Sequence, residues 1–198
     1  MTKRIIGLTG GIATGKTTVA NYLANAYNLP ILDADIYARD AVAVGSPILS
    51  AIAQRYGQQI LLPDGNLNRQ HLGEIIFDHP DERKWVESLI HPYVGDRFNQ
   101  AIAQSHSSTL VLVIPLLFEA QMTNLVTEIW VVHCSNSQQL QRLIHRNQLN
   151  PEQAQTRINS QLSITEKVAR ADIVLDNSST PEALLKQVDV ALTMKSSS

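Results

Sequence analysis

The chain has 198 residues, of which 44% are apolar and 17% charged, and its formal net charge is −2. This length suits one folding unit, and the small net charge gives no field that would attract nucleic acid or an anionic membrane. The single cysteine, Cys134, excludes an internal disulfide bond and a cysteine metal cluster, and we expect it to be buried at a strand end. The sequence shows neither a signal-peptide pattern nor an apolar window of membrane-spanning length, so we expect a cytoplasmic protein.

The first part of the chain predicts a strand, a glycine-rich loop, a helix and a second strand. Residues 5–9 form a short apolar run bounded by glycines, and apolar residues then recur at helical spacing. Residues 29–32 form another apolar run, which leads into Asp33. From residue 36 to about residue 90 the pattern is helical. The predicted N-caps in this region are Ser46 and Asn68.

The rest of the chain alternates helices with three more strands. A long helical stretch is predicted over residues 80–104, Ser137 is expected to cap a later helix, and Asn150 begins another with the spacing of a capping box. A final helix is expected from Thr180 to about residue 194. The three further strands are predicted at residues 109–114, 128–133 and 172–175. This alternation predicts a three-layer α/β/α fold with a mostly parallel, five-stranded sheet whose ligands bind at the carboxyl ends of the strands.

The clearest functional motif is a phosphate-binding loop. Residues 10–17 match the pattern G-x-x-x-x-G-K-[ST] between a predicted strand and a predicted helix. Glycines let the backbone wrap a phosphate with its N–H groups, at a helix N-terminus whose dipole favours anions. Lys16 can reach the β- and γ-phosphates and Thr17 can ligate Mg²⁺, whereas Thr18 contacts the α-phosphate or is only a helix residue. The residues expected to bind ATP here are Gly11, Ala13, Thr14, Gly15, Lys16, Thr17 and Thr18.

The loop alone is compatible with a GTPase switch, a motor ATPase or a kinase. GTPases need the patterns Asp-x-x-Gly and Asn-Lys-x-Asp, and the sequence contains neither. The strand that ends at Ile114 leads into Pro115 rather than into an acidic pair, which argues against a motor ATPase. These absences favour a kinase.

Two acids follow the second predicted strand. Because consecutive strands of such a sheet tend to be neighbours, we expect Asp33 and Asp35 to lie beside the phosphate loop. A carboxylate there can orient an acceptor hydroxyl and take its proton. Asp33 could instead be a loop acid or a water-mediated Mg²⁺ contact, and Asp35 could cap the next helix. Arg39 could pair with Asp35 on the helix surface or hold an acceptor anion.

The segment Asp33-Ala34-Asp35, followed by Arg39, resembles the dephospho-CoA kinase family when it is taken with residues 8–12 at the phosphate loop. The resemblance covers almost the whole chain, with its landmarks in family order. The further landmarks are His91-Pro92, Pro115-Leu116-Leu117-Phe118-Glu119, Arg142, Arg146, Arg157-Ile158, Gln161 and residues 171–177. One departure is Asn147-Gln148, where many relatives carry an acid, and it puts a lid ion pair in doubt.

The resemblance implies that the ATP γ-phosphate is transferred to the ribose 3′-hydroxyl of dephospho-CoA, with Mg²⁺ as cofactor. It implies a nucleotide-binding core (1–37, 88–138 and 166–198), a helical acceptor-binding region (38–87) and a lid (139–165) within one folding unit. The implied catalytic residues are Asp33, Lys16 and Arg142, and Arg146 and Asn177 join the ATP contacts. The implied acceptor contacts are Thr9, Asp33, Asp35, Arg39, His91, Leu116 and Glu119.

Several of these residues have an alternative structural explanation. Arg157 could be a surface group, His91 could pack beside Pro92, Glu119 could be an acid at a helix start, and Asn177 could belong to an ordinary turn. For the whole chain, the alternatives are another small-metabolite or nucleoside-monophosphate kinase, or a nucleotide-binding module without chemistry. We expect ATP and dephospho-CoA as the only partners, and a monomer or weak homo-oligomer.

Overall fold

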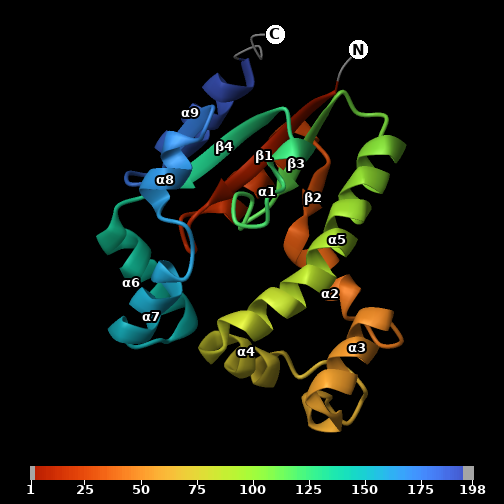
Figure 1. Cartoon of the computed structure of the whole chain (residues 1–198). Coiled ribbons are helices and arrows are strands. Elements are labelled where there is room, and N and C mark those ends of the chain that lie inside the picture. The colour runs from red at the N-terminus through yellow and green to blue at the C-terminus, as the bar shows by residue number, and fades with distance from the viewer. Residues whose placement is uncertain (1–2, 194–198) are drawn as a thin grey trace. The chain divides into compact units, whose positions relative to one another are not determined.

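A five-stranded parallel sheet organises much of the computed structural model, which describes residues 3–193 except the side chain of residue 78. The strand order is β2-β3-β1-β4-β5, and every neighbouring pair is parallel. The sheet confirms the predicted fold class (Figure 1). The strands span Arg4–Gly10 (β1), Ile31–Asp33 (β2), Thr109–Val113 (β3), Glu128–His133 (β4) and Ile173–Asp176 (β5).

The strand order corrects one expectation. We predicted that the first two strands would be neighbours, but β3 lies between β1 and β2. The chain leaves the sheet after β2 for a long helical segment and returns to fill the gap, which local sequence pattern does not reveal. The register still aligns the strand ends, because Asp33 pairs with Val113 and Val113 pairs with Leu8.

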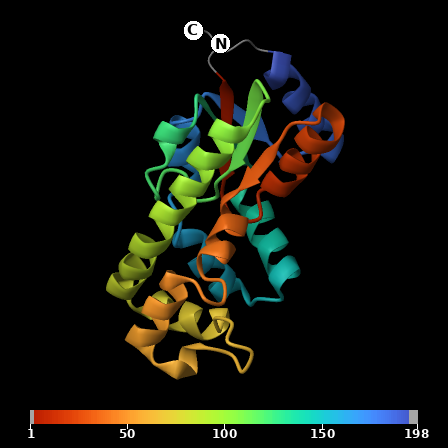
Figure 2. The same ribbon diagram turned by 90° about the vertical axis from the view of Figure 1, so that its right-hand side faces the viewer.

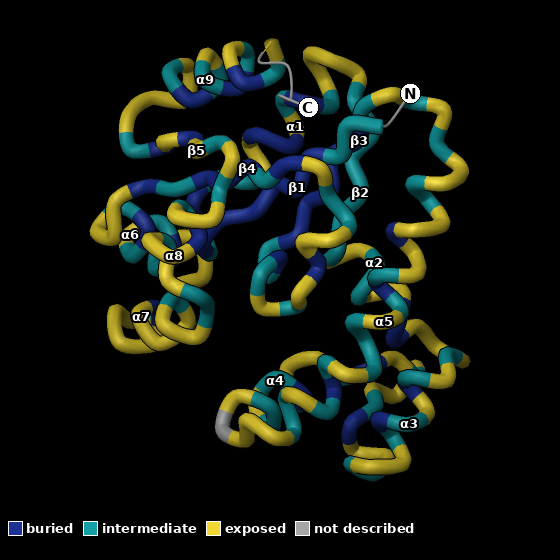
Figure 3. Tube along the Cα trace, turned by 45° about the horizontal axis from the view of Figure 1, so that its top comes forward, coloured by how far each residue is buried: buried dark blue, intermediate teal, exposed yellow. Residues whose placement is uncertain are grey.

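The chain divides into two compact units, residues 1–33 with 104–198, and residues 34–103. Each unit has its own cluster of buried apolar residues. The first cluster joins β1 residues such as Leu8 to Leu23 and Val188. In Figure 3 the central strands are correspondingly dark along most of their length.

Helices cover both faces of the sheet in the first unit. On one face, α1 (Lys16–Tyr27) contacts β1 and β3 and packs against α9 (Pro181–Thr193), which contacts β5. On the other face, α8 (Ile164–Ala169) contacts β4 (Figure 1). The remaining helices of this unit are α6 (Asn136–Asn147), α7 (Pro151–Asn159) and the short 3-10 helix η2 (Thr123–Leu125). The helices cover the two faces of the sheet, and loops follow the carboxyl ends of the strands.

The second unit consists of helices around its own core. They are α2 (Ala34–Ala41), α3 (Pro47–Tyr56), the 3-10 helix η1 (Gln58–Ile60), α4 (Arg69–Asp78) and most of α5 (Pro80–Gln104). Ser46 and Asn68 cap α3 and α4 as predicted, each accepting a backbone N–H three residues later. The helix α5 continues through Pro92. Figure 2 draws this helix in yellow-green to green.

Some predicted element ends were wrong. Helix α6 is capped by Ser135 rather than Ser137, because Ser135 forms a reciprocal capping box with Gln138. The strand β2 begins two residues later than predicted, and β5 is shifted by one residue. The capping box at Asn150 is confirmed, whereas the short helix α8 had not been predicted. Within residues 3–193, no helix has the length and apolar character to cross a membrane.

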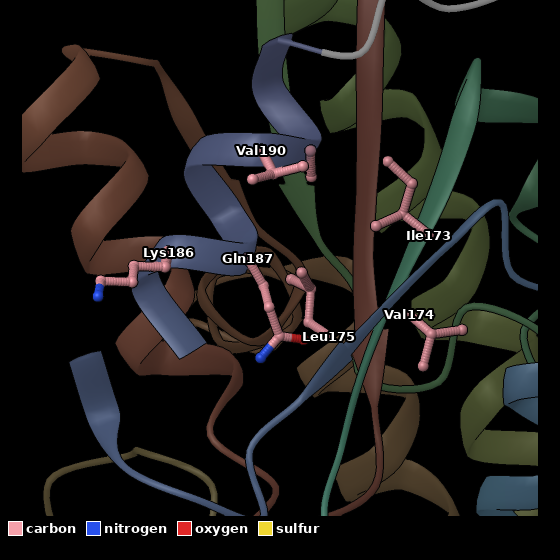
Figure 4. Close-up of a pocket in the computed structure, with 7 residues that line it drawn as sticks. Ile173, Val174, Leu175, Lys186, Gln187 and Val190 are labelled. Carbon is pink, nitrogen blue, oxygen red and sulfur yellow. The ribbon is translucent and has the colours of Figure 1, made fainter. Parts of the chain in front are cut away.

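Gln187 of α9 forms hydrogen bonds with the backbone of the edge strand β5. The backbone N–H of Asp176 donates to Gln187 Oε1 at 2.9 Å, and Gln187 Nε2 donates to the carbonyl oxygen of Asp176 at 2.9 Å. These bonds occupy backbone groups that an open sheet edge would otherwise present to another strand. Gln187 lines a small apolar hollow between the two elements, together with Leu175 and Val190 (Figure 4). The pairing also fixes the backbone next to Asn177.

Candidate active site

The five strands end at one edge of the sheet, where the phosphate loop and Asp33 come together. The loop follows β1 directly, and Asp33 is the last residue of β2. Asp33 is level with Leu8 across β3, and two strand spacings place the β2 and β1 backbones roughly 10 Å apart. Asp33 therefore lies two strands from β1 rather than on the neighbouring strand, and its role beside the phosphate loop stays a prediction.

The phosphate loop has a backbone that requires glycine at two places. Gly15 is the N-cap of α1 with φ 106°, and a Cβ there would overlap the side-chain amide of Asn177. Gly10 has φ 146°, and a Cβ there would overlap the carbonyl oxygen of Val132. Ala13 adopts the left-handed conformation with φ 59° despite its side chain. The loop thus has the tight winding that an anion-binding backbone needs.

The N-terminus of α1 is suited to an anion. Its N-cap makes no side-chain hydrogen bond to the first turn, and the first turn contains no acidic residue. The first amides of a helix lack partners within the helix, and the helix dipole adds positive potential there. Lys16 adds its ammonium group, which donates to the carbonyl oxygens of Gly10 at 3.1 Å and Gly11 at 2.6 Å. Thr17 and Thr18 are exposed in the first turn.

Thr14 and Asn177 tie the loop to the end of β5. Thr14 is fully buried, and its hydroxyl donates to Gly11 O at 2.9 Å. Asn177 is 9% exposed, and its Nδ2 donates to Thr14 O at 2.8 Å. The side chain of Asn177 therefore supports the loop directly, and a contact with adenine stays a prediction.

Arg142 lies on α6 beside the same turn. Its Nη2 donates to Asn177 O at 3.0 Å, while Nη1 is buried without a hydrogen-bond partner among the described residues. A buried guanidinium nitrogen without a partner is unfavourable, and an anion would satisfy it. Arg142 also approaches Cys134, which is buried after β4 as predicted; burial raises the pKa of the Cys134 thiol, and Arg142 opposes that rise.

Arg146 and Arg157 are placed differently. Arg146 is exposed one turn after Arg142, and its Nε donates to Asn147 at 2.9 Å. Arg157 is exposed in the last turn of α7. The hydrogen bond of Arg146 to Asn147 does not join it to the phosphate loop, so its role in ATP binding stays a prediction. Whether Arg157 is a lid contact or a surface group is not decided by its exposure.

Three predicted acceptor contacts, one on β1 and two in the segment after β3, lie in different environments. Thr9 of β1 is fully buried and its hydroxyl donates to Pro115 O at 3.2 Å. Leu116 is half-buried, and Glu119 accepts hydrogen bonds from the backbone of Leu162 and from Lys167. The carboxylate of Glu119 is thus already bound by other groups of the protein.

The other acceptor candidates belong to the second unit. Asp35 and Arg39 are exposed on α2, and His91 is half-buried on α5. Arg69, which sequence analysis had not selected, donates to Arg39 O at 3.4 Å. Burial lowers the pKa of Arg69, and the charge of Arg39 lowers it further. Two neighbouring cations make this part of α2 and α4 attractive to an anion.

Two further residues, Gln139 and Lys167, were also missed. Ile12 donates through its N–H to Gln161 Oε1 at 2.9 Å and accepts from Gln139 Nε2 at 2.9 Å. Lys167 is fully buried. Gln161 was noted only as a family landmark, and neither Gln139 on α6 nor Gln161 in the connection after α7 gives a local signal for a bond to a distant loop.

Comparisons with known proteins agree with this geometry. Residues 4–182 match the protein-family model described as dephospho-CoA kinase. A dephospho-CoA kinase from Nostoc sp. is 75% identical over 195 residues, which are 98% of this chain and 100% of the relative. The solved dephospho-CoA kinase from Campylobacter jejuni has a TM-score of 0.70 and 26% identity over 96% of each chain. Shikimate kinase from Aquifex aeolicus shares the fold alone, with a TM-score of 0.54 and 16% identity over 95% of each chain.

Proposed function

Because this chain belongs to the dephospho-CoA kinase family, we propose which of its residues carry out the phosphoryl transfer. The acceptor is the ribose 3′-hydroxyl of dephospho-CoA, and the products are coenzyme A and ADP. The phosphate loop holds the β- and γ-phosphates of ATP, with Lys16 as the cation along them. Arg142 neutralises charge that develops on the transferred group. Asp33 orients the acceptor hydroxyl and takes its proton.

Nη1 of Arg142 is buried and has no hydrogen-bond partner among residues 3–193, and this is the observation that carries the proposal. The N-terminus of α1 supplies dipole and backbone amides, and Arg142 supplies the hydrogen-bond donors of a guanidinium. Fixed donors stabilise a transition state well because they need no reorganisation when charge develops. Arg146 extends this clamp from the exposed side of α6.

Asp33 gives the site its chemistry. In the transfer, the ribose 3′-oxygen forms a bond to the γ-phosphorus while the bond from that phosphorus to the β,γ-bridging oxygen breaks. The hydroxyl proton passes to the carboxylate of Asp33, and ADP leaves with the bridging oxygen. A carboxylate at the end of β2, level with Leu8 of β1, is suited to hold the hydroxyl in line with a phosphate on the loop.

The donor set near the loop fits Mg²⁺ bound mainly through phosphates. Among residues 3–193, no three histidine, cysteine, aspartate or glutamate side chains form a group that could hold a metal. Mg²⁺ usually keeps several waters and takes few protein ligands together with substrate phosphates. The exposed hydroxyl of Thr17 provides one such ligand. When bound, Mg²⁺ would neutralise phosphate charge.

The acceptor contacts and the setting complete the proposal. We assign the anionic groups of dephospho-CoA to Arg39, with Asp35 and His91 as further acceptor contacts, and we assign residues 38–87 as the acceptor-binding region. Leu116 provides an apolar contact, and residues 139–165 act as the lid. We expect a cytoplasmic monomer or weak homo-oligomer that binds no nucleic acid.

One assay tests the activity and its rivals. The purified protein is incubated with Mg·ATP and either dephospho-CoA, AMP or no acceptor, and ADP and phosphorylated product are followed. We expect turnover that depends on dephospho-CoA and gives coenzyme A. Turnover with AMP but none with dephospho-CoA would instead indicate a nucleoside-monophosphate kinase. Nucleotide binding without any acceptor-dependent turnover would indicate a binding module.

A further inference from the structure

Lys167 in α8 is a charged side chain that is 0% exposed. Its Nζ lies 2.9 Å from Oε1 of Glu119 and donates to the carbonyl oxygen of Pro115 at 3.0 Å. A buried ammonium is tolerated only where a counter-charge and hydrogen-bond acceptors surround it. Lys167 therefore holds the segment after β3 in place. The Glu119 side chain is 25% exposed, so this pair is shielded from much of the solvent.

The same oxygen of Glu119 holds the connection between α7 and α8. Oε1 of Glu119 accepts a hydrogen bond of 2.9 Å from the backbone N–H of Leu162. Leu162 directly follows Gln161 in this connection, which has no regular secondary structure of its own. The position of Gln161 is therefore set by an ion pair whose partners come from two other segments.

Gln161 in turn holds the phosphate loop. Its Oε1 accepts the N–H of Ile12 at 2.9 Å, and Gln139 of α6 donates to the carbonyl oxygen of Ile12 at 2.9 Å. Both backbone groups of Ile12 are thus bound by amide side chains from outside the loop. Gln139 is only 3% exposed, which fixes this second amide as well.

Ala13, which follows Ile12, has an unfavourable backbone conformation that these hydrogen bonds can stabilise. Ala13 is in the left-handed region with φ 59°, a conformation that is unfavourable for an alanine. Such a conformation persists only where the surroundings impose it. The hydrogen bonds on Ile12 constrain the backbone immediately before this strained residue, so they favour the wound form of the loop that binds phosphate.

We propose that Lys167 and Glu119 are positioning residues for the nucleotide. They act through Leu162 and Gln161 on Ile12, and so keep the phosphate loop ready for ATP. This inference rests on the proposed role of residues 10–17 in phosphate binding. It gives Glu119 a role on the nucleotide side of the reaction, in place of a direct contact with the acceptor.

Binding of Mg·ADP to the full-length protein, measured by calorimetry, tests the proposal. Glu119→Gln and Gln161→Leu should each weaken ADP binding about three- to tenfold, as expected when one hydrogen bond no longer supports the bound form. Because both variants interrupt one chain of contacts, the double variant should lie within about twofold of the weaker single variant. Binding of dephospho-CoA should be unchanged in all three.

Gln104→Leu is the matched control. Gln104 is exposed at the end of α5, before the amino end of β3 and away from the phosphate loop, so this variant should bind ADP as the wild type does. Gln161→Leu leaves the ion pair intact and decides the test even if Glu119→Gln does not fold. Thermal denaturation monitored by circular dichroism reports folding for each variant.

Other results would overturn the proposal. ADP affinity within twofold of the wild type in Gln161→Leu would exclude the coupling to Ile12. Independent, multiplying effects of the two substitutions, with weaker dephospho-CoA binding in Glu119→Gln, would show that Glu119 contacts the acceptor. A wild-type protein that binds no ADP would overturn the phosphate-loop proposal and this inference together, whereas wild-type binding with unaffected variants would overturn this inference alone.

Discussion

The guanidinium of Arg142 is held by Asn177 through one nitrogen, with a 3.0 Å bond from Nη2 to the backbone carbonyl oxygen, while Nη1 stays buried without a partner among the described residues. The turn that carries Asn177 also supports Thr14 of the phosphate loop. One turn after β5 therefore sets both the loop and the arginine. This arrangement favours a preorganised donor rather than a mobile surface charge.

Arg142→Gln should lower kcat on the order of 100-fold, because a fixed donor to developing charge is lost. Arg146→Gln should have a smaller effect, about tenfold, since Arg146 is exposed and shares in the clamp only from outside. Lys186→Gln, on α9, removes a positive charge away from the site and serves as the control. Steady-state kinetics with dephospho-CoA checks the order, and equal losses for Arg142 and Lys186 would contradict it.

Asp33→Asn should retain ADP binding and lose transfer. The amide preserves the size of the side chain but cannot accept the hydroxyl proton, so kcat should fall about 100-fold or more. Calorimetry with Mg·ADP and single-turnover transfer measure the two properties separately. A rate within about threefold of the wild type would show that Asp33 is not the base.

Local signals in the sequence were sufficient for the phosphate loop and most helix starts. The caps at Ser46, Asn68 and Asn150 depend on a side chain and a backbone amide three residues later, so both partners lie within one short window. The error at Ser137 has the same origin, because Ser135 offers an equally suitable side chain and forms the capping box. Hydrogen bonds of such short range can be predicted from the sequence without knowledge of the fold.

Long-range pairing could not be predicted in the same way. The insertion of β3 between β1 and β2 depends on how the chain returns from the second unit. The bond between Glu119 and Lys167 joins residues that only the folded sheet brings together. Likewise, Asn177 was expected to contact ATP, and the fold gives its side-chain amide a hydrogen bond to the carbonyl oxygen of Thr14. For such residues, the sequence indicates importance without specifying the partner.

Gly15→Ala should destabilise the protein and weaken nucleotide binding at least tenfold. Gly15 has φ 106°, and a methyl group there would overlap Nδ2 of Asn177, so the loop must shift. We expect a loss of about 1–3 kcal/mol from backbone strain and displaced packing. Urea denaturation and Mg·ADP calorimetry measure the two effects.

Gly45→Ala provides the matched control for this substitution. Gly45 also has a positive φ, 85°, but an added methyl group would meet no described atom within 4 Å. Its cost should be the conformational strain alone, about 1 kcal/mol, with ADP affinity unchanged. If the two alanine variants lost equal stability and equal ADP affinity, the close approach of Asn177 would not explain the need for Gly15.

The lowered pKa of Glu82 predicts that the stability of the helical unit depends on pH. Hydrogen bonds from Arg55, at 2.7 and 2.8 Å, and then from Tyr56 lower the pKa of Glu82 from 4.5 to about 2. A lowered carboxyl pKa means that the stabilisation is fully present above pH 4.5 and is lost as the pH falls towards 2. Glu82→Gln should therefore lower Tm at pH 7, and the difference from the wild type should shrink between pH 4.5 and pH 2.

Thermal denaturation followed by circular dichroism at several pH values measures this difference. Glu74→Gln, an exposed carboxylate on α4 that accepts from Gln70 at 3.1 Å, should give a smaller Tm change that does not follow the same pH window. A Tm difference for Glu82→Gln that stayed constant down to pH 2 would attribute the loss to side-chain packing, because only the ionised carboxylate gains from Arg55.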